Sequence, residues 1–187
     1  MASPEELVDL VDEDDRVLEV VTRAEMRQRG AGARHRACYV DVHTSADELV
    51  VHRRADWKDV YPGWWDVCFG GVLSAGEAWD DAARRELAEE AGIEAELRFL
   101  GAASWDQPDV RLNGRVYVVT HDGPYPCPDG EVVEVATVPL AELTGWLDGH
   151  PVCPDSLDLV VPRLLGYPAA GEPGHGGYSG GASGRSS

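Results

Sequence analysis

Basic residues are scarce in this chain. Its 187 residues include 16 lysines and arginines against 34 aspartates and glutamates, so the formal net charge is −18. Broad electrostatic binding to a nucleic-acid polymer or to an anionic membrane needs an excess of positive charge. The composition therefore argues against both partners. It leaves room for a small anionic substrate held by a local basic cluster or by metal ions.

Long apolar runs are also lacking. No stretch approaches the ~18 apolar residues that would suggest a transmembrane helix, and the acidic start MASPEELVDLVDEDD does not resemble a signal peptide. We therefore expect a cytoplasmic protein. The length is that of one domain, which would act as a monomer or a homodimer.

Cysteines are few and far apart. They show no CxxC pair and no Cys/His spacing typical of a zinc site. The four are Cys38, Cys68, Cys127 and Cys153. We expect reduced thiols that mostly pack in the core, because free cysteine is among the most buried residue types.

The distribution of apolar residues predicts one domain, residues 1–168, followed by a disordered Gly/Ser-rich tail, residues 169–187, that has almost nothing to bury. Strands are predicted at 6–11, 17–21, 37–42, 48–52, 94–103, 115–121 and 131–138, with a hairpin between the third and fourth. Helices are predicted at 22–29, 79–91, 140–147 and 156–165. Because helices and strands do not alternate regularly, the expected fold class is α/β (α+β), a mixed sheet covered by helices.

Three glutamates crowd one turn of the helix predicted at 79–91, which Gly92 ends. Glu86, Glu89 and Glu90 are spaced i, i+3 and i+4, so they share one face. Their mutual repulsion costs a few tenths of a kcal/mol per pair and brings no structural benefit unless a cation binds there. Three carboxylates suit a hard divalent ion such as Mg²⁺, which prefers oxygen ligands. The alternative is a solvated acidic face.

The wider spacing decides between these interpretations. From Gly71 through Glu77 and Arg85 to Ile93, every element matches the pattern Gx5Ex7REUxEExGU, in which U is aliphatic. A random match has a probability on the order of 10⁻⁷ for a chain of this length. Residues 71–93 thus resemble the Nudix box of the Nudix hydrolases. The resemblance implies a mixed β-sheet sandwiched between helices and a loop-helix-loop that holds divalent metal and cleaves diphosphate linkages.

Site roles follow from this resemblance, position by position. The family's metal-binding positions are occupied by Glu86, Glu89, Glu90 and, through its backbone carbonyl, Gly70. Arg85 and Glu77 match the pair that links the loop to the helix and orients the carboxylates. The implied cofactor is Mg²⁺, with Mn²⁺ as an alternative.

Metal-assisted hydrolysis also needs a carboxylate that takes the proton of the attacking water. In many members of the family this group comes from a later loop. Glu131 and Glu134, in DGEVVEVATV, are the candidates here. We predict Glu134, which stands directly before an apolar strand.

A basic cluster lies upstream of the Nudix box. Arg53, Arg54 and Lys58 stand close together in an otherwise acidic chain and are candidates to bind phosphate. The layout RR…K…PGWWD resembles the branch of Nudix proteins related to isopentenyl-diphosphate isomerase, which includes the bacterial YfcD-type proteins. His35 keeps an isomerase-like position and is a further substrate-binding candidate, although a lone histidine at a strand start is more often a core residue.

Isomerase chemistry is the main alternative. Isomerases carry a Cys-Gly-His run where this chain has Phe69-Gly70-Gly71, so the catalytic cysteine and the metal-binding histidine are both replaced. Cys68 is one residue away, and on a strand that offset points a side chain to the opposite face. No glutamate occurs at 113–115, where the isomerase has its Glu-x-Glu.

The sequence therefore predicts a metal-dependent Nudix hydrolase that cleaves a diphosphate linkage in a nucleoside di- or triphosphate or a related conjugate. A second alternative is a protein that senses nucleotides without turnover, but no glutamate of the signature is missing. Two predicted loops, 105–114 and 122–130, are expected to select the leaving group. Trp57, Trp64, Trp65 and Trp105 would stack on a base or pack in the core.

Overall fold

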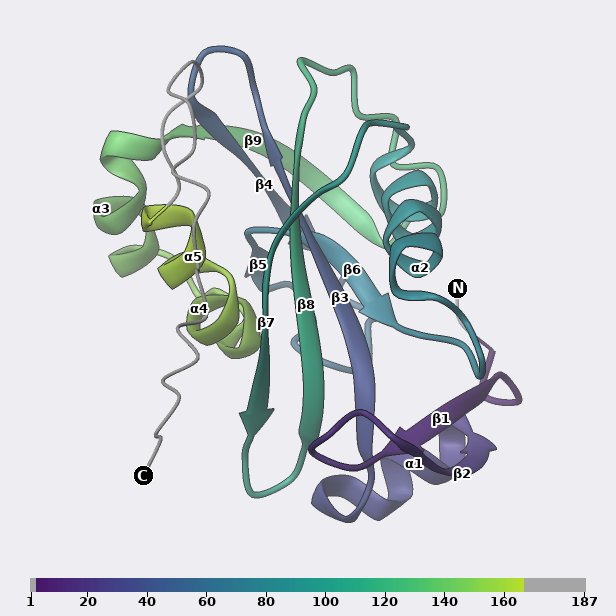
Figure 1. Ribbon diagram of the computed structural model, residues 1–187. Helices are drawn as coiled ribbons and strands as arrows, with labels where there is room; N and C mark the ends of the chain where they lie inside the picture. Colours follow the sequence, from purple (N-terminus) through teal and green to yellow (C-terminus); the bar gives the residue numbers. More distant parts are fainter. Residues whose placement is uncertain (1–2, 167–187) are drawn as a thin grey trace, which may run out of the picture.

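Two sheets, one large and one small, frame the structure, a computed structural model that describes residues 3–166 (Figure 1). The strands are β1 (Leu7–Val11), β2 (Val17–Thr22), β3 (Arg34–His43), β4 (Glu48–Arg54), β5 (Trp65–Asp66), β6 (Phe69–Val72), β7 (Arg98–Asp106), β8 (Arg111–Thr120) and β9 (Val132–Pro139). The tail that we predicted to be disordered lies outside the described residues.

The large sheet is built around β3. Its order is β5-β4-β3-β8-β7, with β6 also paired to β3 and β9 to β4. β3 and β8 run parallel over ten residue pairs, and the other pairings are antiparallel. The sheet is therefore mixed, as expected.

Helices cover both faces of this sheet (Figure 1). The helices that cover it are α2 (Trp79–Glu86), α3 (Leu143–Asp148), α4 (Pro154–Leu159) and α5 (Val161–Leu165), whereas α1 (Arg23–Arg29) packs on the small sheet. The 3₁₀ turns are η1 (Gly30–Gly32) and η3 (Leu140–Glu142), and the π-helical turn is η2 (Leu87–Ala91). On one face, Leu87 packs with Val40 and Phe69, and on the other Leu143 and Val160 pack over β3 and β4. The predicted sheet between helices is confirmed.

The N-terminal strands and α1 form a small unit with its own core of Val8, Leu10 and Met26. A capping box begins α1, because the Thr22 side chain accepts from the Glu25 amide and Glu25 returns the contact. This unit lies at one end of β3, where it places α1 beside the large sheet (Figure 1).

Several predicted boundaries were wrong. The expected hairpin of β3 and β4 pairs only at His43 and Leu49, because β6 takes the next position along β3. The helix expected at 156–165 is two helices broken at Val160, since Pro162 has no amide hydrogen to donate. The predicted loop 105–114 is mostly the ends of β7 and β8.

Two other expectations concern composition. All four cysteines are free, and three of them are buried, as predicted. Within residues 3–166, no helix has the length and apolar character needed to cross a bilayer.

Candidate active site

The acidic turn predicted from the sequence lies where α2 widens into the π-helical turn η2. Turns of this kind are frequent at functional sites. Glu86 ends α2, and Glu89 and Glu90 lie in η2, which ends at Gly92 in a left-handed conformation with φ 72°. Glu86 and Glu90 are buried, 8% and 5% exposed, whereas the Glu89 side chain is 52% exposed. The three glutamates therefore do not share one environment.

Burial of two neighbouring carboxylates is electrostatically costly. Burial raises the pKa of Glu86, although Arg85 opposes the shift, and burial together with the charge of Glu86 raises the pKa of Glu90 to about 8. The nearest cations are Arg85, whose Nη1 lies 2.7 Å from Glu86 Oε1, and Lys58, whose Nζ lies 3.8 Å from Glu90 Oε1. The negative charge of the three glutamates therefore exceeds the positive charge of the two nearest cations, Arg85 and Lys58.

Arg85 connects α2 to the loop before it. Its Nε and Nη2 donate to the two carboxylate oxygens of Glu77 at 2.8 and 2.9 Å, while its Nη1 donates to Glu86. Although burial opposes it, the bond from Arg85 lowers the pKa of Glu77. The guanidinium therefore links the loop to the carboxylate cluster, in the roles expected for Arg85 and Glu77.

Two glycines of β6 lie beside the carboxylates in positions that are too close-packed for a side chain. Gly70 donates its amide to Glu90 Oε2 at 3.0 Å. A Cβ on Gly70 would overlap the backbone oxygen of Cys38, and a Cβ on Gly71 would lie 2.6 Å from Glu86 Oε1. Neither position accepts a side chain without moving its neighbours.

Of the two later glutamates, Glu131 lies beside the cluster. Lys58 contacts its carboxylate and also approaches Glu90. Glu134, which we predicted as the base, instead accepts from Arg53 Nε at 3.2 Å and is 54% exposed. Glu131 directly precedes β9, and its backbone oxygen accepts from the Ala55 amide at 2.8 Å, which holds it against the segment that carries Lys58.

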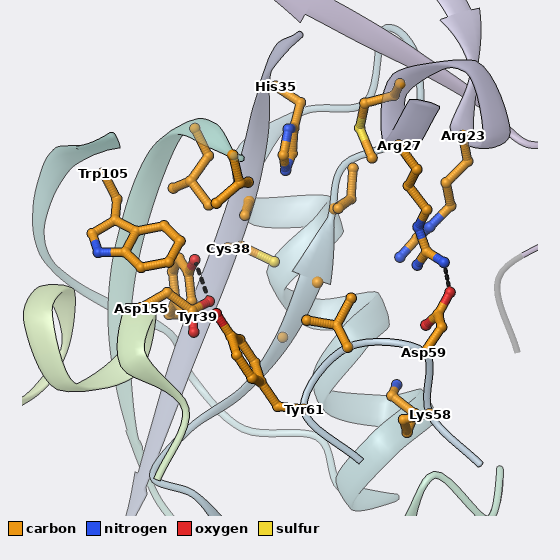
Figure 2. A pocket seen from close by; sticks show the side chains of 18 of the residues that line it. Arg23, Arg27, His35, Cys38, Tyr39, Lys58, Asp59, Tyr61, Trp105 and Asp155 are labelled. Carbon is orange, nitrogen blue, oxygen red and sulfur yellow. Dashed lines mark hydrogen bonds and ion pairs between the residues drawn. The ribbon is translucent and has the colours of Figure 1, made fainter. Parts of the chain in front are cut away.

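A cavity of about 570 Å³ opens along β6 between α1, the segment after β4 and the sheet (Figure 2). Arg54, Lys58 and His35 line it, whereas Arg53 does not. His35 is buried, its Nδ1 is 3.3 Å from the Ala33 oxygen, and burial lowers its pKa to about 4. His35 is thus a neutral wall residue that still reaches the cavity.

The two ends of the cavity differ in chemistry (Figure 2). Arg23 and Arg27 of α1 and Lys58 lie at one end, and Arg27 pairs with Asp59 across it. At the other end lie Trp105, Tyr39, Tyr61 and Asp155. Gly70 and Gly71, which contact the carboxylate cluster, also line the cavity.

Comparison with known proteins gives the family. The family model of the NUDIX domain matches residues 33–155. This chain belongs to the Nudix family. Its relatives include PA4841 of Pseudomonas aeruginosa, named as an uncharacterised Nudix hydrolase, which is 41% identical over 85% of this chain and 94% of its own length. YfcD of Escherichia coli, also named as an uncharacterised Nudix hydrolase, is 36% identical over 83% of this chain and 85% of its own length.

A solved structure of similar fold is DR0079 of Deinococcus radiodurans. Its TM-score is 0.72 at 26% identity, and the match covers 84% of this chain and 99% of DR0079. The Nudix fold and the assignment to the Nudix hydrolases are thus confirmed.

Nudix hydrolases generally depend on divalent metal ions, and the donor chemistry of this Nudix box fits such an ion. Among residues 3–166, the side chains as they stand form no ready group of three or more metal-ligating residues. The exposed Glu89 side chain pairs instead with Arg85, whose Nη1 lies 3.5 Å from Glu89 Oε2. A bound cation would nevertheless stabilise the ionised forms of Glu86 and Glu90, because both carboxylates are buried and the pKa of each is raised. Gly71, which has no Cβ, leaves room for the Glu86 carboxylate.

The relatives of this Nudix chain are named as hydrolases, and Phe69 and Gly71 replace the cysteine and histidine of the isomerase run. Phe69 stacks on His52 on the α2 side of the sheet, and Cys68 packs with the opposite cluster, so the two residues point to opposite faces as predicted. The Cys68 thiol lies 3.5 Å from both Asp66 and Ser156. Burial and the charge of Asp66 raise its pKa well above the usual range, which disfavours a reactive thiolate.

The cavity residues that the sequence analysis of this Nudix domain missed include Arg23, Arg27 and Asp155. A signal for the arginines was present, because they are spaced i, i+4 on a short helix and must share a face. Asp155 had no such signal, since it lies in α4, far from the Nudix box in sequence.

Proposed function

We propose that this Nudix hydrolase uses Mg²⁺ to cleave a diphosphate linkage in a nucleoside di- or triphosphate or a related conjugate. The observation that carries the proposal is the pair of buried carboxylates, Glu86 and Glu90, next to a cavity with a cationic end. Mn²⁺ is the alternative ion, because it accepts similar oxygen ligands.

The cationic end supports a phosphate-bearing substrate. Arg23, Arg27 and Lys58 line it in a chain whose net charge is −18, so basic side chains gather where the Nudix box meets the cavity. They pair there with Glu6, Asp59 and Glu131, respectively. Guanidinium groups bind phosphate oxygens through paired hydrogen bonds, and a lysine acts as a point charge. Burial and the charge of Arg23 lower the pKa of Arg27, and a phosphate beside both guanidinium groups would favour their charged forms.

In this proposal Glu86, Glu89, Glu90 and the carbonyl of Gly70 hold the metal. A divalent ion there supplies positive charge that offsets the charge developing on the phosphate oxygens. Lys58 bridges Glu90 and Glu131 and positions both carboxylates. Glu131, rather than Glu134, takes the proton of the attacking water, because it lies beside the cluster.

The metal assignment is tested with a panel of nucleoside di- and triphosphates in Mg²⁺, using Glu90→Gln and the exposed Glu142→Gln as its matched control. We expect kcat/KM of Glu90→Gln to fall by at least ~100-fold, because one buried ligand charge is lost. In a thermal melt, Mg²⁺ should raise the Tm of the wild type and of Glu142→Gln. The increase should be smaller for Glu90→Gln. Unchanged activity and an unchanged Mg²⁺ effect in Glu90→Gln would overturn the assignment.

The base is tested by comparing Glu131→Gln with Glu134→Gln. We expect Glu131→Gln to lower kcat by about 10²-fold or more and to remove the acidic limb of the pH–rate profile, since a general base contributes on this scale. Glu134→Gln should keep kcat within about twofold. The reverse pattern would restore Glu134 as the base.

A further inference from the structure

The end of the cavity away from the Nudix box is aromatic and carries one carboxylate without a full set of partners (Figure 2). Trp105 is 6% exposed, and its indole nitrogen donates to Asp158 Oδ2 at 2.8 Å, which fixes the ring in the cavity wall. Tyr61 projects toward the same region from the segment after β4 (Figure 2). Fixed aromatic rings of this kind favour a flat ligand group.

Asp155 is the polar group of this end that lacks a full set of hydrogen bonds. Its Oδ2 accepts from the Tyr39 hydroxyl at 3.0 Å. Its Oδ1 is buried, and within residues 3–166 it has no hydrogen-bond partner. A buried acceptor without a partner is costly, so a donor brought by a ligand would be stabilised there. Burial and the charge of Asp66 raise the pKa of Asp155 above its ordinary value.

None of the neighbouring charged side chains among the described residues donates a hydrogen bond to Asp155 Oδ1. Asp66 accepts from Ser156 at 2.5 Å and from the Val67 amide at 2.9 Å, and Arg54 lies 3.7 Å from it. Arg54 therefore offsets Asp66, and the other cations of the cavity, Arg23, Arg27 and Lys58, lie at the opposite end (Figure 2). The free acceptor Asp155 Oδ1 therefore favours a hydrogen-bond donor of the ligand and repels an oxygen acceptor placed against it.

We propose that Asp155 selects nucleotides whose base carries an exocyclic amino group, which donates to Asp155 Oδ1 while the base lies against Trp105 and Tyr61. This inference rests on the proposed function, because the phosphates then lie toward Arg23 and Lys58. In a base with a carbonyl at the same position, two acceptors face each other and the carboxylate oxygen stays unpaired. Sites built to hydrogen-bond a substrate group discriminate strongly against analogues that lack it.

The test uses nucleotide pairs that differ only in this group, namely cytidine against uridine and adenosine against inosine di- and triphosphates, with Mg²⁺ and the full chain. We expect the wild type to show at least a tenfold higher kcat/KM for the amino member of at least one pair. In Asp155→Asn the ratio should fall toward one or invert, because the carboxamide can donate to the carbonyl. Asp148→Asn, an exposed change of the same charge, should keep the wild-type ratio.

Equilibrium binding of the diphosphates, followed by tryptophan fluorescence, separates this inference from the hydrolase assignment. A wild type that binds the amino member at least tenfold more tightly than its carbonyl partner but hydrolyses neither refutes the proposed hydrolysis of these nucleotides and supports the role of Asp155. A wild type that hydrolyses both members of each pair equally refutes the role of Asp155, and this result does not depend on whether Asp155→Asn folds. An unchanged ratio in a folded Asp155→Asn refutes it as well.

Discussion

At the scale of single residues, the missing side chain of Gly71 matters as much as the carboxylate beside it. Gly71 lies on β6 directly opposite Glu86, so the absence of a Cβ lets the carboxylate approach the strand. The same position would hold a metal-binding histidine in an isomerase. The glycine at position 71 therefore replaces an isomerase ligand and at the same time leaves space for the Glu86 carboxylate.

Gly71→Ala tests this arrangement. A Cβ there would come within 2.6 Å of Glu86 Oε1, so the carboxylate must move. We expect kcat/KM to fall by at least tenfold while the variant stays folded, as measured by steady-state kinetics and circular dichroism. Gly145→Ala is the control, because a Cβ there meets nothing within 4 Å. Equal activity in the two variants would contradict the role of Gly71.

At the scale of elements, the loop after β6 and the helix α2 act as one unit because Arg85 joins them. Its guanidinium contacts Glu77 in the loop and Glu86 on the helix at the same time. A flat group with several fixed donors can do this, whereas an ammonium cannot contact both carboxylates in the same geometry. The position of Glu86 thus depends on a contact between two elements.

We expect Arg85→Lys to lower kcat/KM by about tenfold or more, because the carboxylates lose their fixed orientation. The matched control is Arg84→Lys on the same helix, where Arg84 is exposed and pairs only with Asp81 at 3.2 Å. That variant should keep wild-type kinetics, since exposed ion pairs contribute little. Loss of activity in both variants would point to the helix rather than to the link.

At the scale of the whole molecule, stability depends on a histidine buried at the centre of the sheet. His52 is 1% exposed and stacks on Phe69 with ring centroids 4.5 Å apart. Burial lowers its pKa to about 4. In the unfolded chain the ordinary value near 6.5 applies, so below this pH the unfolded state binds a proton that the folded state refuses. His52 therefore makes the fold less stable as the pH falls from about 6.5 toward 4.

His52→Gln removes this titration. We expect the stability of the variant relative to the wild type to increase by about 2 kcal/mol between pH 7.5 and pH 5. Urea unfolding of both proteins at each pH measures the difference between their free energies of unfolding. The contributions of the other titrating groups cancel in this difference, because both proteins contain them. A difference that does not change with pH would show that His52 does not titrate as its burial implies.

How much could be predicted depended on the distance between residues in the sequence. The helix at 79–91 and its three glutamates followed from local spacing, and only the widening of its last turn was missed. The sequence favoured Glu134 over Glu131 as the base because both precede or begin the same strand, whereas the contact of Glu131 with Lys58, on which our proposal of Glu131 rests, joins residues 73 positions apart. Asp155 was missed for the same reason, since its partner Tyr39 is 116 positions away.

The sequence by itself determined the Nudix box, the family and the loss of the isomerase residues at Phe69 and Gly71, because these are patterns of adjacent residues. Only the tertiary structure decided which carboxylates are buried, that Glu131 lies beside Glu90, and that α1 and α4 supply opposite ends of one cavity. Which residues become neighbours in space depends on the pairing of strands and on the packing of helices on a shared sheet. These contacts depend on the whole core, and no short stretch of the chain encodes them.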